Sequence, residues 1–145
     1  DEENKTIDLF DFKTGTISDT DTWHSKESLY IYHFQLLFYR LLLKQSRTYR
    51  NYTVRSMHLL FTSPNRREVL TNPEGKMHDI ELKESDIAKD SVNFEDLLLA
   101  VYYQITSLNF LDSNSSLNFK DINNASLADI KDFCQTLVEF YKKAY

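Results

Sequence analysis

The sequence predicts an α/β (α+β) fold, in which a small mixed sheet is flanked by helices. Apolar runs with the alternation of strands occur at 7–15, 52–61 and 77–82, and longer runs with helical spacing lie between and after them. Only two glycines and two prolines occur in 145 residues, which favours long elements over a loop-rich fold. We expect a single domain over residues 1–145, because 41% apolar residues can bury a substantial core at this length.

Charge and cysteine usage exclude several classes of protein. The net charge of −5 provides no overall basic field, which counts against a self-sufficient nucleic-acid-binding module. A single cysteine, Cys134, excludes an internal disulfide and a cysteine-rich zinc or iron–sulfur cluster within this chain. The sequence shows neither a signal-peptide pattern nor an apolar run of about 18 residues, so we expect a cytoplasmic protein with no membrane partner.

The first strand is expected from Ile7 to Gly15 and carries Asp11-Phe12-Lys13 near its end. Side chains two positions apart on a strand share a face, so Asp11 and Lys13 place a carboxylate beside an ammonium. A carboxylate can hold a magnesium ion, and a nearby lysine can orient a water molecule and neutralise charge on a phosphate. The alternative is a solvated ion pair on an edge strand.

A polar linker at 14–25 leads to a helix expected from Ser28 to Ser46, and Ser25 offers a hydroxyl to cap its first amides. Gln35 and Tyr39 lie one turn apart on one face of this helix. Alone, such a pair is more often a surface amide and a core aromatic residue. We expect the helix to be buried on most sides, because its apolar residues form a broad arc: Leu29, Tyr32, Leu36, Leu37, Phe38, Tyr39, Leu41, Leu42 and Leu43.

The end of this helix and the turn after it are basic, with Arg40, Lys44, Arg47 and Arg50. Cations at a helix C-terminus compensate the helix dipole. The same side chains could instead contact phosphate groups.

The remaining elements complete the sheet and add two helices. A strand at Tyr52–Phe61 is followed by a turn and by a hairpin at 68–83, whose turn sequence is Asn-Pro-Glu-Gly. We expect this hairpin at the edge of the sheet. A helix opens at 91–95 and ends near Asn109, a Ser/Asn-rich loop follows, and a last helix begins at Ser126, where Asp129 completes a capping box. The expected inward residues are Leu97, Leu98, Val101, Ile105 and Leu108 in the first of these helices, and Ile130, Phe133, Leu137, Phe140 and Tyr141 in the second.

The order of these motifs resembles a known nuclease superfamily. A strand ending in Asp-Phe-Lys-Thr-Gly, a polar loop and a helix carrying Gln-Leu-Leu-Phe-Tyr are similar to the RecB-type branch of the PD-(D/E)xK nucleases. Within that branch, the chain resembles the C-terminal nuclease-type domain of UvrD/PcrA-type superfamily 1 DNA helicases. The further similarities are Lys26-Glu27-Ser28-Leu29-Tyr30, Tyr52-Thr53-Val54 and the strand that ends in Pro64-Asn65.

The resemblance implies a restriction-endonuclease-like core and a role for each matching residue. Asp11 would be a metal ligand, Lys13 the catalytic lysine, and Gln35 and Tyr39 a helix pair that lines the site and helps to place the DNA. The implied cofactor is Mg²⁺ or Mn²⁺. The implied partner is DNA, which would be bound through a larger parent protein. ATP would be used only by other domains of that protein.

The chain also departs from the family pattern. The family has a second essential aspartate on the strand before the Asp-x-Lys strand, whereas residues 1–6 read here as the polar turn between those strands. We therefore expect an N-terminally incomplete domain with no nuclease activity of its own. Some RecB-type nucleases carry a cysteine cluster near the C-terminus, and with one cysteine we expect no iron–sulfur cluster here.

Two alternatives stay open at this stage. The same fold could serve as a non-catalytic module that docks protein or DNA in a helicase, which the acidic charge and the missing acid favour. An unrelated α/β domain with a chance Asp-x-Lys would place Asp11 and Gln35 on opposite sides of the sheet.

Overall fold

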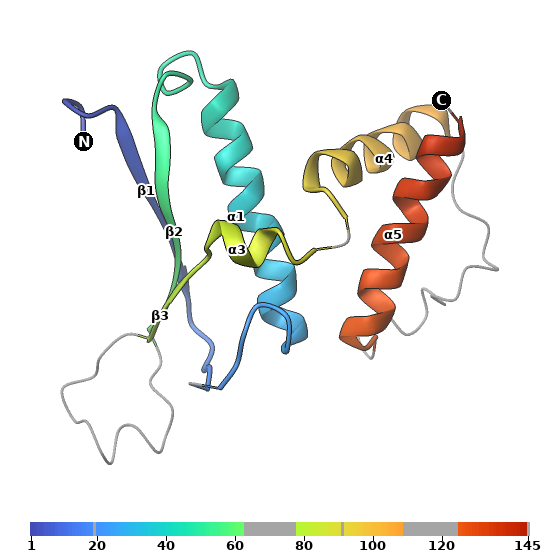
Figure 1. Ribbon diagram of the computed structural model, residues 1–145, viewed down its shortest axis with the longest axis horizontal. Helices are drawn as coiled ribbons and strands as arrows, with labels where there is room; N and C mark the ends of the chain where they lie inside the picture. Colours follow the sequence, from blue (N-terminus) through green and yellow to red (C-terminus); the bar gives the residue numbers. More distant parts are fainter. Residues whose placement is uncertain (19, 63–77, 91, 109–124, 145) are drawn as a thin grey trace. The chain divides into compact units, whose positions relative to one another are not determined.

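The computed structural model describes residues 1–18, 20–62, 78–90, 92–108 and 125–144 (Figure 1). The chain divides into two compact units, residues 1–87 and residues 88–145. Each unit has its own secondary structure and its own buried apolar side chains. In the part of the chain that is described, no helix combines the length and the apolar character needed to cross a membrane.

The first unit contains a three-stranded mixed sheet with the order β1-β2-β3. Strands β1 and β2 are parallel, and β3 is antiparallel to β2. Parallel neighbours need a long crossover connection, which α1 supplies. The predicted small mixed sheet with flanking helices is therefore confirmed. The elements of this unit are β1 (Thr6–Lys13), α1 (Glu27–Gln45), β2 (Thr53–Phe61), β3 (His78–Glu81) and the short helix α3 (Glu84–Ile87), which the sequence did not predict.

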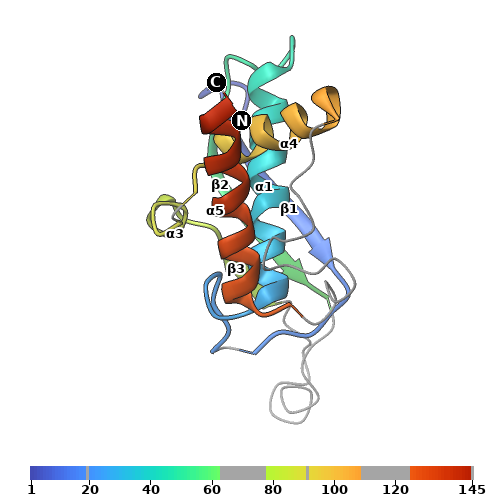
Figure 2. The ribbon, with the colours of Figure 1, turned by 90° about the vertical axis from the view of Figure 1, so that its right-hand side faces the viewer.

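Helix α1 covers one face of the sheet, as Figure 2 shows from the side of the helix. Leu29 and Leu36 on the helix and Leu59 on β2 are fully buried. Each such leucine stabilises the folded state by roughly 1.5–3 kcal/mol relative to an exposed one. The helix is not buried on most sides as expected, because Phe38 is 40% exposed and Leu42 is 52% exposed. A three-stranded sheet covers only the stripe of the helix that faces it.

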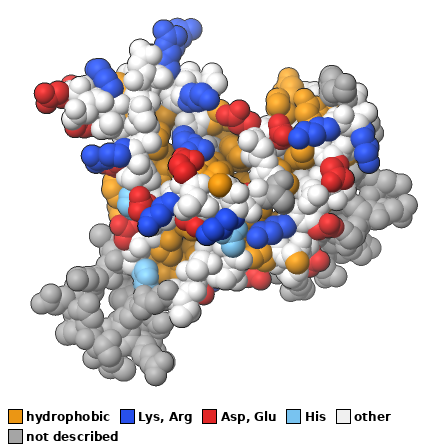
Figure 3. Space-filling model, viewed as in Figure 1, with side chains coloured by type: hydrophobic (Ala, Val, Ile, Leu, Met, Phe, Trp, Pro, Cys, Tyr) orange, Lys and Arg blue, Asp and Glu red, His pale blue; other side chains and the backbone are white. Residues whose placement is uncertain are grey.

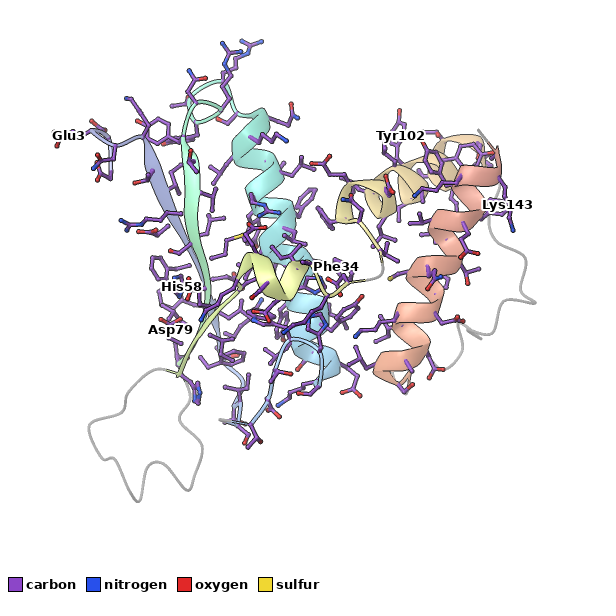
Figure 4. The ribbon with its side chains drawn as sticks, viewed as in Figure 1. Glu3, Phe34, His58, Asp79, Tyr102 and Lys143 are labelled. Carbon is purple, nitrogen blue, oxygen red and sulfur yellow. The ribbon has the colours of Figure 1, made fainter. Side chains whose placement is uncertain are left out.

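The opposite face of the sheet carries polar pairs and exposed aromatic rings. Phe10 and Phe12 project there from β1, and they are 52% and 63% exposed. The Phe10 ring stacks on His58 of β2 with centroids 4.9 Å apart. His58 Nδ1 in turn lies 2.8 Å from Asp79 Oδ1 of β3, and Figure 4 labels both residues.

A β-bulge interrupts the pairing of β1 with β2. Ile7 pairs with Val54, but Asp8 pairs with Ser56, so Arg55 is an extra residue in β2. The Arg55 guanidinium forms an ion pair with the Asp8 carboxylate, and Ser56 Oγ donates a hydrogen bond of 2.7 Å to Asp8 Oδ1. The hydrogen bonds from Arg55 and then from Ser56 lower the pKa of Asp8 to about 2.

The linker before α1 is anchored to the sheet. Trp23 is buried, and its Nε1 donates a hydrogen bond of 3.1 Å to the carbonyl oxygen of Glu81. The predicted cap at Ser25 is wrong, because Ser25 Oγ accepts a hydrogen bond from the amide of Thr22 and Lys26 occupies the N-cap position without a side-chain cap. Of the predicted hairpin, β3 is observed beside β2, and residues 63–77 lie outside the described residues.

The second unit contains the helices α4 (Phe94–Ser107) and α5 (Leu127–Ala144). The side chain of Asn93 accepts hydrogen bonds from the amides of Glu95 and Asp96, which caps α4. The capping box predicted for α5 is confirmed, because the Ser126 amide donates to Asp129 Oδ2 at 2.9 Å and Ser126 Oγ accepts from the Asp129 amide at 3.3 Å. The Ser/Asn-rich loop expected at 112–118 lies outside the described residues.

The inward face of α4 differs from the prediction. Val101, Ile105 and Leu108 are exposed, and Ala100 is the buried residue of this helix. A helix of apolar residues on more than one face has more than one possible inward stripe, and the spacing alone does not choose among them. In α5, Leu137 is buried as predicted, and the other buried residues are Cys134 and Val138, which directly follow Phe133 and Leu137 of the predicted stripe.

Candidate functional site

The candidate site lies at the carboxyl end of β1, on the face of the sheet that α1 covers. Asp11 and Lys13 alternate with the exposed Phe10 and Phe12, so they point to the helix side of the strand. Their side chains are only 18% and 16% exposed. Period-two alternation therefore places both charged groups in a partly buried environment.

Two side chains from α1 meet this strand pair. Lys13 Nζ lies 2.7 Å from Asp11 Oδ2 and donates a hydrogen bond of 2.7 Å to Gln35 Oε1. Gln35 Nε2 donates a hydrogen bond of 2.5 Å to the hydroxyl of Tyr39, one turn further along the helix. The four residues predicted to share a site thus form one continuous polar chain, in the order Asp11, Lys13, Gln35 and Tyr39.

This arrangement bears on one of the alternatives left open by the sequence, the unrelated domain. Asp11 and Gln35 lie on the same side of the sheet, both within contact of Lys13. The opposite placement, which would have indicated an unrelated domain with a chance Asp-x-Lys, is not observed.

Sequence reasoning missed one member of the site, Tyr32. Lys13 Nζ lies 4.1 Å from the centroid of the Tyr32 ring, which is within the range of a cation–π interaction. Tyr32 precedes Gln35 by three residues, so both lie on the same face of α1. The helical spacing contained this signal, but Tyr32 was assigned to the apolar stripe. We name Asp11, Lys13, Tyr32, Gln35 and Tyr39 the strand–helix cluster.

The Asp11 carboxylate has unused capacity to accept. Its Oδ2 atom is buried and accepts no hydrogen bond in the described part of the chain, because the nearby Lys13 ammonium meets it at an ion-pair distance without hydrogen-bond geometry. A buried carboxylate oxygen without a donor is costly unless a cation compensates it. The Lys13 ammonium supplies that compensation, and the same carboxylate also has the chemistry of an oxygen ligand to a hard divalent cation.

One carboxylate does not complete a divalent-cation site. Among the described residues, no group of three or more His, Cys, Asp and Glu side chains is arranged to hold a metal ion. Mg²⁺ is commonly bound through one or two carboxylates, with waters and substrate phosphates as the other ligands. The residues present fit Mg²⁺ or Mn²⁺ as a partial ligand set, to which a second acid would have to be added.

Two of the four histidines, His24 and His58, have structural partners. His24 Nε2 lies 2.9 Å from the carbonyl oxygen of Asp86, which ties the linker to α3. His58 is paired with Asp79 on the opposite face of the sheet. Neither histidine adds a ligand to the strand–helix cluster.

The basic end of α1 is divided between two environments. Arg40 Nη1 lies 2.5 Å from Glu84 Oε1 and is thereby neutralised within the first unit. Arg47 and Arg50 lie in the exposed turn between α1 and β2. Arg47 and Arg50 are therefore exposed to solvent, whereas Arg40 is paired with Glu84.

Comparison of the chain with protein-family models, with curated proteins and with solved structures finds no match. The likeness to RecB-type nucleases therefore depends on the residues and geometry described above.

Proposed function

We propose that the chain is the C-terminal part of a RecB-like nuclease-type domain of a DNA helicase or repair nuclease, which hydrolyses DNA phosphodiester bonds with a divalent metal ion when complete. The observation that carries this proposal is the continuous contact from Asp11 through Lys13 and Gln35 to Tyr39. The strand motif and the helix motif are separated in the sequence by a linker and half a helix. In the sequence, only the family resemblance suggested that they share one site. A cytoplasmic location belongs to the same proposal.

Each residue has a role that follows from its contacts. Asp11 would hold Mg²⁺ or Mn²⁺ together with a second acid, and the bound metal ion would supply an activated water and charge neutralisation at the phosphate. Lys13 places its ammonium beside Asp11 in a partly buried site, where such a group can stabilise negative charge that develops on a phosphate. Gln35 accepts from Lys13 and donates to Tyr39, so it fixes the position of both groups.

The test is DNA cleavage with Mg²⁺ or Mn²⁺ by a protein that includes the residues encoded upstream of this chain. We expect Lys13→Ala to reduce the cleavage rate by at least about a hundredfold, because a positioned catalytic group contributes about 10²–10⁴-fold. Lys83→Ala is the matched control, since it also removes one lysine, which is 63% exposed and 3.9 Å from the Glu81 carboxylate. The 145-residue chain alone is expected to show no cleavage. Undiminished cleavage by the Lys13 variant would remove this residue from the mechanism.

A second function is favoured by one observation. The Lys13 ammonium already compensates the Asp11 carboxylate, so the cluster can be a structural ion pair in a non-catalytic docking module. Calorimetric titration of the longer protein with Mg²⁺ separates the two functions. A complete catalytic site binds Mg²⁺ with a measurable heat, and Asp11→Asn abolishes this heat. A docking module gives no heat of Mg²⁺ binding.

A further inference from the structure

The turn between α1 and β2 carries two arginines that form no ion pair within the described residues. Arg47 and Arg50 are exposed, and neither makes an ion pair with any residue of the described ranges. The other two arginines in those ranges, Arg40 and Arg55, each bind a carboxylate. Within the described residues, these two guanidinium groups are therefore open to an anion.

Hydrogen bonds hold this turn in one conformation. Ser46 Oγ accepts from the amides of Thr48 and Tyr49 at 3.3 and 3.4 Å, and the Arg50 amide donates to the carbonyl oxygen of Ser46 at 3.0 Å. The Tyr52 amide closes the turn with a bond of 2.8 Å to the carbonyl oxygen of Tyr49. A turn that is already ordered presents its side chains at a lower entropic cost on binding.

Tyr49 and Tyr52 are close to the arginines in sequence, and Lys5 contacts Tyr52. Tyr49 is 44% exposed, and its ring meets the Tyr52 ring edge to face with centroids 5.7 Å apart. Lys5, at the start of β1, has its Nζ 5.0 Å from the centroid of the Tyr52 ring. We name these residues the turn cluster: Lys5, Arg47, Tyr49, Arg50 and Tyr52.

Cations interleaved with an exposed aromatic ring suit single-stranded nucleic acid. Such surfaces bind phosphates through Lys and Arg and stack bases on aromatic side chains. Figure 3 shows Lys and Arg side chains at the end of the first unit where this turn lies. Glu2 and Glu3 are close in sequence to Lys5, yet neither forms an ion pair with the two arginines. Residues 47–51 include no aliphatic side chain that could enter a lipid bilayer.

We propose that the turn cluster binds single-stranded nucleic acid, with Arg47 and Arg50 on phosphates and Tyr49 stacked against a base. The cluster shares no residue with the strand–helix cluster, and the part of β1 from Thr6 to Asp11 that separates Lys5 from Asp11 spans roughly 17 Å. Binding here does not require the cleavage proposed above. It relies on that proposal only for the choice of DNA as the test strand.

The test is the fluorescence anisotropy of a labelled oligothymidine strand, titrated with the 145-residue chain in EDTA at several salt concentrations. Arg47→Gln combined with Arg50→Gln is expected to weaken binding and to reduce the slope of log affinity against log salt by about 1.4, because each phosphate contact to a single strand contributes about 0.7. Lys83→Gln combined with Lys143→Gln is the matched control. It makes the same change in net charge at two exposed lysines outside the turn cluster, and it should leave the slope unchanged.

A second variant separates stacking from charge. Tyr49→Ala is expected to weaken binding by at least about fivefold without a change in the salt slope, since loss of one stacked base is worth that much or more. Tyr49→Phe keeps the ring and should bind as the unchanged chain does.

Three results would overturn the proposal. They are no measurable binding of the strand, equal losses in the arginine variant and the lysine control, and binding confined to vesicles that contain phosphatidylserine. Because EDTA excludes metal-dependent cleavage, a failure of the Lys13→Ala experiment leaves this measurement and its interpretation unchanged.

Discussion

Lys13 is a flexible side chain that three partners hold in one position. Asp11 supplies an opposite charge, Gln35 an acceptor oxygen and Tyr32 the face of a ring. Fixing a lysine side chain costs up to about 2 kcal/mol of conformational entropy, so the order of this group depends on the sum of its contacts. A lysine that has to act at one atom of a substrate benefits from such positioning before the substrate arrives.

Tyr32 is expected to position Lys13 through its ring. Replacing Tyr32 by Leu removes the π face, which should destabilise the fold by about 1 kcal/mol and increase the mobility of the Lys13 ammonium. NMR relaxation of the labelled lysine side chain measures that mobility directly. Tyr32→Phe retains the ring and should keep Lys13 ordered. An equally ordered Lys13 in the Leu variant would show that Asp11 and Gln35 suffice.

The residues of this cluster differ in how far the sequence could predict them. Asp11 with Lys13 follows from the period of a strand, and Gln35 with Tyr39 follows from the period of a helix. That the two pairs meet depends on how the crossover helix lies on the sheet, which only the resemblance suggested. Tyr32 was missed because an aromatic residue in a helical stripe is usually part of the core, and its contact with a cation arises only from the tertiary structure.

At the scale of the elements, local chemistry predicted some helix ends and failed at others. The Ser126 and Asp129 box forms because both partners lie within one turn. Ser25 fails as a cap because its hydroxyl accepts from the Thr22 amide, which draws it into the preceding turn. The bulge at Arg55 has no local sequence signal, because it depends on the pairing of Arg55 and Ser56 with Asp8 across two strands.

Asn93 is expected to determine the stability of α4. Its side chain accepts from two amides at the helix start, so Asn93→Ala should reduce the free energy of unfolding by about 1 kcal/mol. Urea denaturation followed by circular dichroism measures this loss. Asn93→Ser retains a capping oxygen and should stay close to the original stability. A loss of the same size in the Ser variant would mean that the cap is not the cause.

At the scale of the whole molecule, each compact unit contains its own spectroscopic or chemical reporter. The only tryptophan of the chain, Trp23, is buried in the first unit, and the only cysteine, Cys134, is buried in the second. Length and composition predict one folded domain, but neither property indicates where a chain divides into compact parts. The two reporters allow the units to be followed separately in one sample.

The two units also contain the groups that respond to opposite extremes of pH. Asp8, in the first unit, has a pKa of about 2 in the folded state, below its ordinary value of 3.8, because Arg55 and Ser56 donate to it. Its contribution to stability is present above pH 3.8 and is lost as the pH falls through about 2. Burial raises the pKa of the Cys134 thiol to about 11 from 9.0, with a further contribution from Asp90. Its contribution is present below pH 9.0 and is lost as the pH rises through about 11.

Two substitutions are expected to remove these dependences one at a time. Asp8→Asn should flatten the acid limb of stability, measured by urea denaturation with Trp23 fluorescence, because an amide does not titrate. Cys134→Ala should flatten the alkaline limb, measured by circular dichroism, although cavity formation lowers its stability at every pH. Each variant serves as the control for the other, since Asp8→Asn leaves the alkaline limb intact and Cys134→Ala leaves the acid limb intact. An acid limb that is unchanged in Asp8→Asn would mean that the bulge pair with Arg55 contributes nothing to the pH dependence of folding.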